Sequence, residues 1–258
     1  MSETTEEQEK SFACLTDIGK KRKNNEDAAY AASSRYGKML IIADGMGGHR
    51  KGEVASKIVI DELSSAFHEV KKNLTVSGAR KLLRKHLKKA NEDIYRLSLN
   101  GDDYKEMGMT AVCAHVCTDG TYVMSIGDSR CYTYSDSSGL VRKTTDQTYV
   151  ELLFETGKIS KSEMATHPQK NLLINAVGIN PDLNQIQETT FSNDSYDVIL
   201  LCSDGLYNGI SESEMEGVLK ERKTSAKEKC KVLIDLALFN DENDNIAVSI
   251  LENQPTDE

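Results

Sequence analysis

Hydrophobic residues fall into short strand-like runs and two long helical patterns. In the first fifth of the chain, apolar runs predict strands over 12–16, 28–32 and 39–43. In the stretch that follows, apolar residues recur every three or four positions, as they do on one face of an α-helix. We therefore expect helices over 53–70 and 77–99, the second burying Leu83, Leu87, Ala90, Ile94 and Leu97.

The rest of the chain returns to strands and then to a second pair of helices. Strands are predicted over 110–117, 121–126, 130–134, 185–191, 198–202 and 246–251, and helices over 149–155, 211–220 and 225–238. Asp119-Gly120 is a typical hairpin turn between the first two of these strands. Blocks of strands separated by paired helices predict an α+β layered fold rather than alternating βαβ units. No linker rich in proline, glycine or serine divides the chain, so we expect a single domain over 11–252.

The composition excludes several classes of protein. The net charge is −9, whereas general nucleic-acid binding requires a basic surface. No apolar run is long enough to cross a membrane, and the acidic start, MSETTEEQEK, does not resemble a signal peptide. We therefore expect residues 1–10 to be a disordered acidic tail and the protein to be cytoplasmic, with no nucleic-acid or membrane partner. The six cysteines contain no C-x-x-C pair and are expected to be reduced, mostly buried thiols.

One face of the predicted helix over 77–99 is strongly basic. It carries Arg80, Lys81, Arg84, Lys85, Lys88 and Lys89. A surface for an acidic partner is one interpretation of this face. A solvated helix face is the simpler interpretation and is preferred from the sequence alone.

The segment MLIIADGMGGH, residues 39–49, ends an apolar strand on a carboxylate and follows it with three glycines. An acid in that place is costly unless a charged or hydrogen-bonding group meets it, and glycine lets another group come close. The dinucleotide-binding pattern fails here because its sixth position is Arg50. The P-loop pattern fails because Lys51 is followed by Gly52 and Glu53.

Carboxylates recur at the ends of predicted strands. They are Glu26 and Asp27 before the second strand, Asp44 after the third, Asp128 after the fifth, Asp204 in LLCSDGL and Asp244 in NDENDNIAVSIL. Clustered carboxylates repel one another unless protons or cations lie between them, and hard oxygen ligands favour Mg²⁺ or Mn²⁺. The sequence therefore predicts a divalent metal site. A calcium-binding EF-hand loop over 241–252 is rejected because its sixth position, which needs glycine, is Ile246.

Taken together, these motifs resemble the metal-dependent protein serine/threonine phosphatases of the protein phosphatase 2C family, in particular its compact bacterial-type members. The matching segments are TDIGKKRKNNEDA, IIADGMGGH, MGMTAV, SIGDSRCY, HPQKN, LLCSDGL and NDNIAVSIL, in the family's order and across nearly all of residues 12–251. The resemblance implies a four-layer α-β-β-α sandwich with two mainly antiparallel sheets. It also implies a centre of two Mn²⁺ or Mg²⁺ ions per chain, with a third, weaker site.

The resemblance also assigns a role to each candidate residue. Asp44 would bridge both ions, the carbonyl of Gly45 would bind one, and Asp204 and Asp244 would hold the other. Asp27 would act mostly through water, with Glu26 in support, and Asp128 would serve the third ion. Arg22 would grip the substrate phosphate, which suits its planar, permanently charged guanidinium. The catalytic residues are therefore expected to be Arg22 and Asp44.

The implied reaction is hydrolysis of phosphoserine and phosphothreonine in proteins, reversing a serine/threonine kinase, by a monomer whose segment 146–180 forms a variable flap. The alternative is a regulatory pseudophosphatase that binds a partner without hydrolysis. Three positions depart from the family pattern. Met109 replaces a threonine, and we expect this change to affect packing. The segment NDEN precedes Asp244 where glycines are usual. His49, in the glycine turn, is not assigned a general-acid role.

Overall fold

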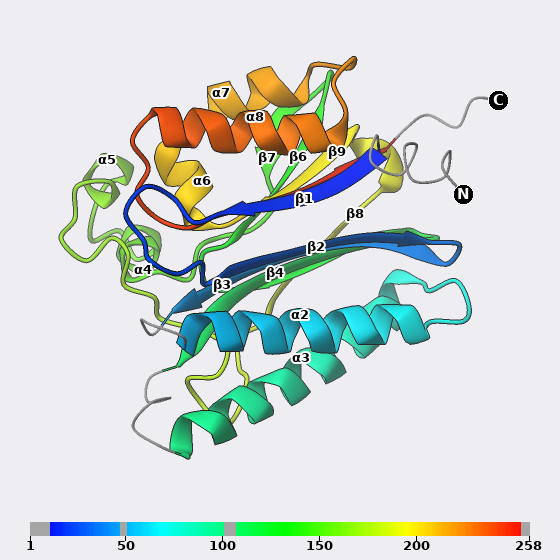
Figure 1. Cartoon of the computed structure of the whole chain (residues 1–258), viewed down its shortest axis with the longest axis horizontal. Coiled ribbons are helices and arrows are strands. Elements are labelled where there is room, and N and C mark those ends of the chain that lie inside the picture. The colour runs from blue at the N-terminus through cyan, green and yellow to red at the C-terminus, as the bar shows by residue number, and fades with distance from the viewer. Residues whose placement is uncertain (1–10, 47–50, 101–106, 254–258) are drawn as a thin grey trace.

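The computed structural model describes residues 11–46, 51–100 and 107–253, and it shows two β-sheets stacked face to face between two layers of helices (Figure 1). The first sheet has the order β1-β10-β9-β6-β7, and its neighbouring strands are all antiparallel. These strands are β1 (Phe12–Asp17), β6 (Arg130–Ser135), β7 (Gly139–Arg142), β9 (Val198–Cys202) and β10 (Ile246–Glu252). The predicted tail, residues 1–10, lies outside the described residues.

The second sheet has the order β2-β3-β4-β5-β8 and is also antiparallel throughout. Its strands are β2 (Asp27–Ser34), β3 (Gly37–Met46), β4 (Gly108–Cys117), β5 (Gly120–Ile126) and β8 (Gln187–Phe191). A tight turn joins β2 to β3, since Ser34 pairs with Gly37. The predicted turn at Asp119-Gly120 joins β4 to β5.

Three apolar clusters hold the layers together. Side chains such as Ile42, Val112 and Ile199 fill the space between the two sheets. On the outer face of the second sheet lie α2 (Lys51–Glu69) and α3 (Val76–Leu99), and on the outer face of the first lie α6 (Asp204–Gly209), α7 (Glu212–Leu219) and α8 (Ala226–Phe239). The predicted α+β, α-β-β-α sandwich with two antiparallel sheets is thus confirmed.

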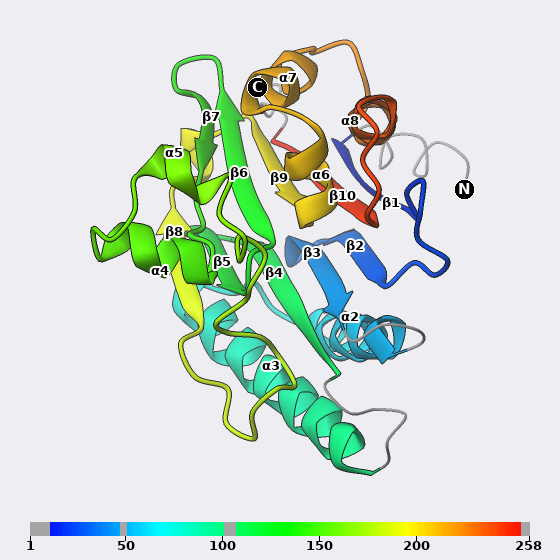
Figure 2. The ribbon, with the colours of Figure 1, turned by 90° about the vertical axis from the view of Figure 1, so that its left-hand side faces the viewer.

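The segment that follows β7 projects from one end of the sandwich (Figure 2). It contains α4 (Tyr149–Glu155), at the predicted position, and α5 (Lys161–Met164), which was not predicted. A short 3₁₀ turn, η2 (Asn193–Ser195), lies between β8 and β9. None of the helices in the described ranges is long and apolar enough to span a membrane.

Candidate active site

The acids at the strand ends come together at one end of the sandwich, from both sheets. Asp27 opens β2 and pairs in register with Asp44 near the end of β3. Asp128 lies in the turn between β5 and β6, Asp204 begins α6 directly after β9, and Asp244 lies two residues before β10. Figure 2 looks onto this end, where α6 and the ends of β3 and β10 face the viewer. Asp44 interacts electrostatically with the four other aspartates of this set, Asp27, Asp128, Asp204 and Asp244.

Asp27 and Asp44 form the buried centre of this group. The two residues lie directly opposite each other in the register of β2 and β3. Burial raises the pKa of Asp27 to about 7, although the bonds from Ser203 and Asp44 oppose this shift. Burial raises the pKa of Asp44 well above its usual range, and the charges of Asp27 and Asp204 add to the rise.

Asp204 shares the same electrostatic environment. Burial raises its pKa well above the usual range, and the charges of Asp128, Asp244 and Asp27 raise it further. Such a group of carboxylates is stabilised by protons or by cations, and its hard oxygen donors suit Mg²⁺ or Mn²⁺. Among the described residues, no group of three or more histidine, cysteine, aspartate or glutamate side chains is placed so that it could hold a metal ion as it stands. The fit to a metal thus rests on the donor chemistry and on this mutual repulsion.

The glycine turn after Asp44 allows a close backbone approach. A β-carbon on Gly45 would lie 2.3 Å from the carbonyl oxygen of Gly52, and one on Gly52 would lie 2.4 Å from Oε2 of Glu26. The Gly45 N–H donates to the Glu26 carbonyl at 3.2 Å. Glycine is needed at both positions because any side chain would push α2 away from β3 and displace Glu26. His49 lies outside the described residues.

Two residues that the sequence analysis did not single out position the acids. Ser203 Oγ donates to Asp27 Oδ2 at 2.6 Å and accepts from the Ala247 N–H at 2.8 Å, which links β2 to β10. Asn245 Oδ1 accepts from the Glu26 N–H at 2.8 Å, while its Nδ2 donates to the carbonyls of Ile18 and Asn24. Their only sequence signal is their place next to Asp204 and Asp244.

The loop NDEN takes its shape from a side chain. Glu242 Oε1 accepts from the N–H groups of Asn243 and Asp244, at 2.7 and 2.9 Å, and Asp241 adopts a left-handed φ of 63°. These two bonds tighten the turn without glycine. The departure from the family pattern therefore leaves Asp244 directed at the acidic group, where its charge raises the pKa of Asp204.

Arg22 lies beside Asp244. Its Nη2 donates to Asp244 Oδ2 at 2.6 Å, and this bond is the main cause that raises the pKa of Arg22. The side chain is 53% exposed. A guanidinium has five N–H donors, so its other donors are available to a ligand at the mouth of the site.

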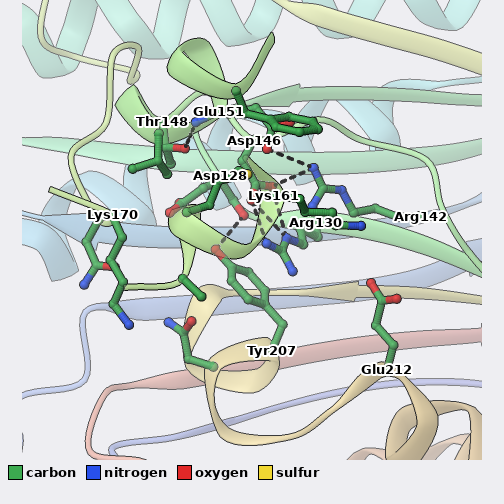
Figure 3. A pocket seen from close by; sticks show the side chains of 16 residues that line it. Asp128, Arg130, Arg142, Asp146, Thr148, Glu151, Lys161, Lys170, Tyr207 and Glu212 are labelled. Atoms are coloured by element: carbon green, nitrogen blue, oxygen red, sulfur yellow. Dashed lines mark hydrogen bonds and ion pairs between the residues drawn. The ribbon is translucent and has the colours of Figure 1, made fainter. Parts of the chain in front are cut away.

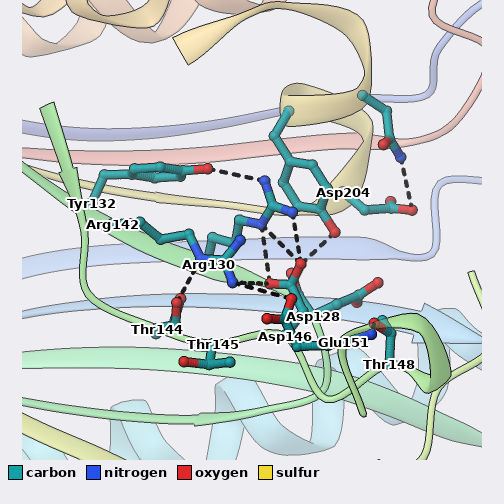
Figure 4. Close-up of polar contacts among 12 residues, drawn as sticks. Asp128, Arg130, Tyr132, Arg142, Thr144, Thr145, Asp146, Thr148, Glu151 and Asp204 are labelled. Carbon is teal, nitrogen blue, oxygen red and sulfur yellow. Dashed lines mark hydrogen bonds and ion pairs between the residues drawn. The ribbon is translucent and has the colours of Figure 1, made fainter. Parts of the chain in front are cut away.

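Asp128 belongs to a second polar cluster (Figure 4). Arg130 grips Asp146 through Nε and Nη2, with the shortest contact at 2.6 Å, and its guanidinium lies 3.4 Å from the ring centre of Tyr207. Tyr207 in turn donates to the carbonyl of Asp128 at 3.1 Å. Burial raises the pKa of Asp128 to about 6, Asp146 adds to the rise, and Arg130 opposes it.

A pocket of about 680 Å³ opens beside this cluster (Figure 3). Asp128, Asp146 and Tyr207 line one side, and Glu151, Lys161 and Lys170 contribute from the projecting segment. This segment is tied to the site at its root, because Gln147 exchanges hydrogen bonds with the N–H and carbonyl of Gly127, both at 2.9 Å.

Met109 ties down the other end of the projecting segment. Its backbone exchanges two hydrogen bonds with Val177, at 3.0 and 2.9 Å, and its side chain is fully buried in the core beneath the second sheet. The structure therefore places Met109 in a packing position, which agrees with the effect expected from the sequence.

Comparison with known proteins agrees with this architecture. The model of the protein phosphatase 2C family matches residues 19–235. The serine/threonine phosphatase stp of Listeria welshimeri is 36% identical over 240 residues, which cover 92% of this chain and 93% of the relative. The protein phosphatase PhpP of Streptococcus pneumoniae is 33% identical over 251 residues, or 93% and 96% of the two chains.

Solved structures share the fold. Stp1 from Staphylococcus aureus superimposes with a TM-score of 0.86 at 33% identity, covering 95% of each chain. The catalytic domain of the serine/threonine phosphatase PstP, in complex with 2 manganese ions, superimposes with a TM-score of 0.79 at 29% identity, covering 93% of this chain and 96% of that one.

Proposed function

The chain belongs to the protein phosphatase 2C family, and from that membership and the site we propose that it hydrolyses phosphoserine and phosphothreonine in proteins with the help of two Mn²⁺ or Mg²⁺ ions. Its curated relatives are serine/threonine phosphatases, and this chain is an enzyme of that class. The observation that carries the metal-dependent mechanism is the grouping of Asp27, Asp44 and Asp204 beside Asp244, whose charge helps to raise the pKa of the other three.

The residues have separate tasks in this proposal. Asp44 and the carbonyl of Gly45 would hold one ion, and Asp44, Asp204 and Asp244 the other, while Asp128 would serve a weaker third ion. Bound ions of this kind supply an acidified water and neutralise charge on the phosphoryl oxygens. Asp27 and Glu26 would orient water at the edge of the site, and Ser203 fixes the carboxylate of Asp27 for that role.

Arg22 would bind the phosphoryl group. The half-exposed guanidinium donates one hydrogen bond to Asp244. A phosphate bound beside Asp244 would therefore accept hydrogen bonds from the remaining N–H groups of Arg22. Charge-assisted bonds from arginine to phosphate oxygens are short and strong, and they gain strength as negative charge develops in the transition state. The catalytic residues of the proposal are therefore Arg22 and Asp44.

The pseudophosphatase alternative is less well supported. A pseudoenzyme that has lost its activity usually lacks part of its ligand set, whereas every acidic residue that the family pattern requires is present in this chain. We further propose a cytoplasmic monomer that counteracts a serine/threonine kinase, and a flap over 146–180 that selects among substrates. The pocket of about 680 Å³ between that segment and Asp128 supports the last point.

The test is phosphate release from a phosphothreonine peptide with Mn²⁺, with Mg²⁺ and with a chelator. We expect release only with a metal, and at least a hundredfold loss in Asp204→Asn, because the substitution removes a ligand charge but keeps the shape. Asp61→Asn, at an exposed acid on α2, is the matched control and should keep full activity. Full activity in folded Asp204→Asn would refute the metal assignment. No release from the folded wild type with either metal would favour the pseudophosphatase.

A further inference from the structure

A groove of about 530 Å³ lies between the end of α2 and the start of α3, far from the acidic site. Its floor is apolar and consists of Ala66, Val70, Leu74 and Leu82. At Gly78 an added β-carbon would meet nothing closer than 3.5 Å, so the groove is open there for lack of a side chain. This surface plays no part in the proposed reaction.

Four lysines line the rim of the groove, namely Lys71, Lys72, Lys81 and Lys85. None of these four forms an ion pair with any described residue, and Glu69 is the single acid among the lining residues that the structure describes. The rim therefore carries a net charge of about +3 on a chain whose net charge is −9.

The rest of the basic face of α3 behaves differently. Arg80 and Arg84 pair with Glu188 on β8, at 3.5 and 2.9 Å, and Lys89 pairs with Glu62 on α2 at 2.5 Å. The structure thus divides the basic run into three parts: Arg80, Arg84 and Lys89 pair with acids of β8 and α2, Lys81 and Lys85 line the apolar groove, and Lys88 is exposed outside it. A merely solvated helix face does not explain why four unpaired lysines from α3 and the end of α2 line the rim of one apolar groove.

The groove is a preformed feature of the fold. The loop between the two helices is bonded to the β4–β5 turn, where the Thr118 N–H donates to the Leu74 carbonyl at 3.1 Å and the Val76 N–H donates to Asp119 Oδ1 at 2.7 Å. Lys71 Nζ donates to the His68 carbonyl at 3.1 Å, which caps the end of α2. A preformed groove lowers the entropy cost of binding.

We propose that this groove docks an acidic amphipathic segment of a partner protein. Leucine-sized side chains of the segment would occupy the floor over Leu74, Gly78 and Leu82, and its carboxylates would pair with the lysines of the rim, in the helix-in-groove mode. A flat anionic membrane fits less well, because the apolar surface is concave and the rest of the chain is acidic.

The groove and the active site lie at opposite ends of α2 (Figure 1). Gly52, in the first turn of α2, approaches Glu26 of the site, and Val70 follows the last residue of the helix. Nineteen helical residues span roughly 28 Å at 1.5 Å per residue. A segment docked in the groove would therefore tether its protein near the site without entering it, which raises the local concentration of a phosphorylated residue.

The test uses the full-length chain labelled with ¹⁵N and a synthetic peptide with leucine on one helical face and glutamate on the other. We expect amide shift changes at Leu74, Gly78 and Leu82, and binding that weakens as salt is added. Lys81→Glu with Lys85→Glu should weaken the affinity about tenfold or more. Gly78→Leu should block binding by filling the groove, since Gly78 lines it and an added β-carbon meets nothing closer than 3.5 Å.

Controls separate this site from the catalytic one. Lys223→Glu with Lys231→Glu, on the helical layer over the other sheet, should leave peptide affinity unchanged, and all of these variants should hydrolyse a short phosphopeptide at the wild-type rate. The proposal is overturned if the peptide does not bind up to millimolar concentration, or if the groove variants leave its affinity unchanged. Shift changes at the strand-end acids, or binding to phosphatidylserine vesicles in place of the peptide, would also overturn it.

Discussion

The pair of Arg130 and Asp146 supports the wall of the site beside Asp128, and its removal should be costly. Their side chains are 16% and 9% exposed, and three Arg130–Asp146 contacts of 2.6–3.2 Å hold them together. Asp146→Ala leaves a buried guanidinium without its carboxylate, and removing one partner of a buried ion pair costs about 3–5 kcal/mol. Arg142, 3.6 Å from Asp146, adds a second positive charge to the gap. We expect a loss at the upper part of that range.

Urea unfolding of the chelated protein measures this cost, with phosphopeptide hydrolysis beside it. The double variant Arg130→Met with Asp146→Leu should recover most of the stability, because it removes both charges and keeps the packing volume. The exposed pair of Arg222 and Asp136 is the matched control, and Asp136→Ala should cost far less than Asp146→Ala because water solvates both of its charges. Equal losses from Asp146→Ala and Asp136→Ala would refute the reasoning that burial makes the first pair important.

Three further predictions concern single residues. Gly205→Ala places a β-carbon 2.1 Å from the Asn245 carbonyl, so it should lower the free energy of unfolding by about 1–3 kcal/mol and impair hydrolysis. Its control is Gly217→Ala, where the β-carbon meets nothing within 4 Å. That variant should stabilise helix α7 by up to about 1 kcal/mol in thermal unfolding. Asn245→Ala removes three hydrogen bonds that hold the loop of Arg22, so the KM for phosphopeptide should rise. Asn245→Asp keeps the acceptor for the Glu26 N–H but sets a carboxylate oxygen against the carbonyls of Ile18 and Asn24, so it should raise the KM as well. Burial lowers the pKa of His115 to about 4, so the imidazole binds a proton more readily in the unfolded state than in the folded state. As the pH falls from 7 towards 4, this difference should lower the free energy of unfolding by roughly 3 kcal/mol. His115→Leu should reduce this acid loss in urea titrations, and an identical loss in both proteins would contradict the assignment.

Much of the fold was predictable because its periodicity is local. Apolar residues alternate along β5 and recur every three or four positions along α3. Both patterns involve residues close together in the sequence, so the predicted and observed bounds of these elements agree closely. The elements that were not predicted, α5, α6, β7 and η2, are short and have no such period. Asp204 was placed just after the strand over 198–202, and the structure makes it the first residue of α6, with Ser203 as the N-cap.

By itself, the sequence determined which acids stand at strand ends, because an apolar run followed by a carboxylate is a local pattern. Only the tertiary structure decided which of them meet, since Asp27 begins a strand of one sheet and Asp204 follows a strand of the other, and Ser203, next to Asp204, donates to Asp27. The same holds for the basic helix, where Glu188, over a hundred residues from Arg84, neutralises one side and leaves the lysines of the groove unpaired. The physical reason is that burial and Coulomb interactions depend on distance in space, which the order of residues in the chain does not record.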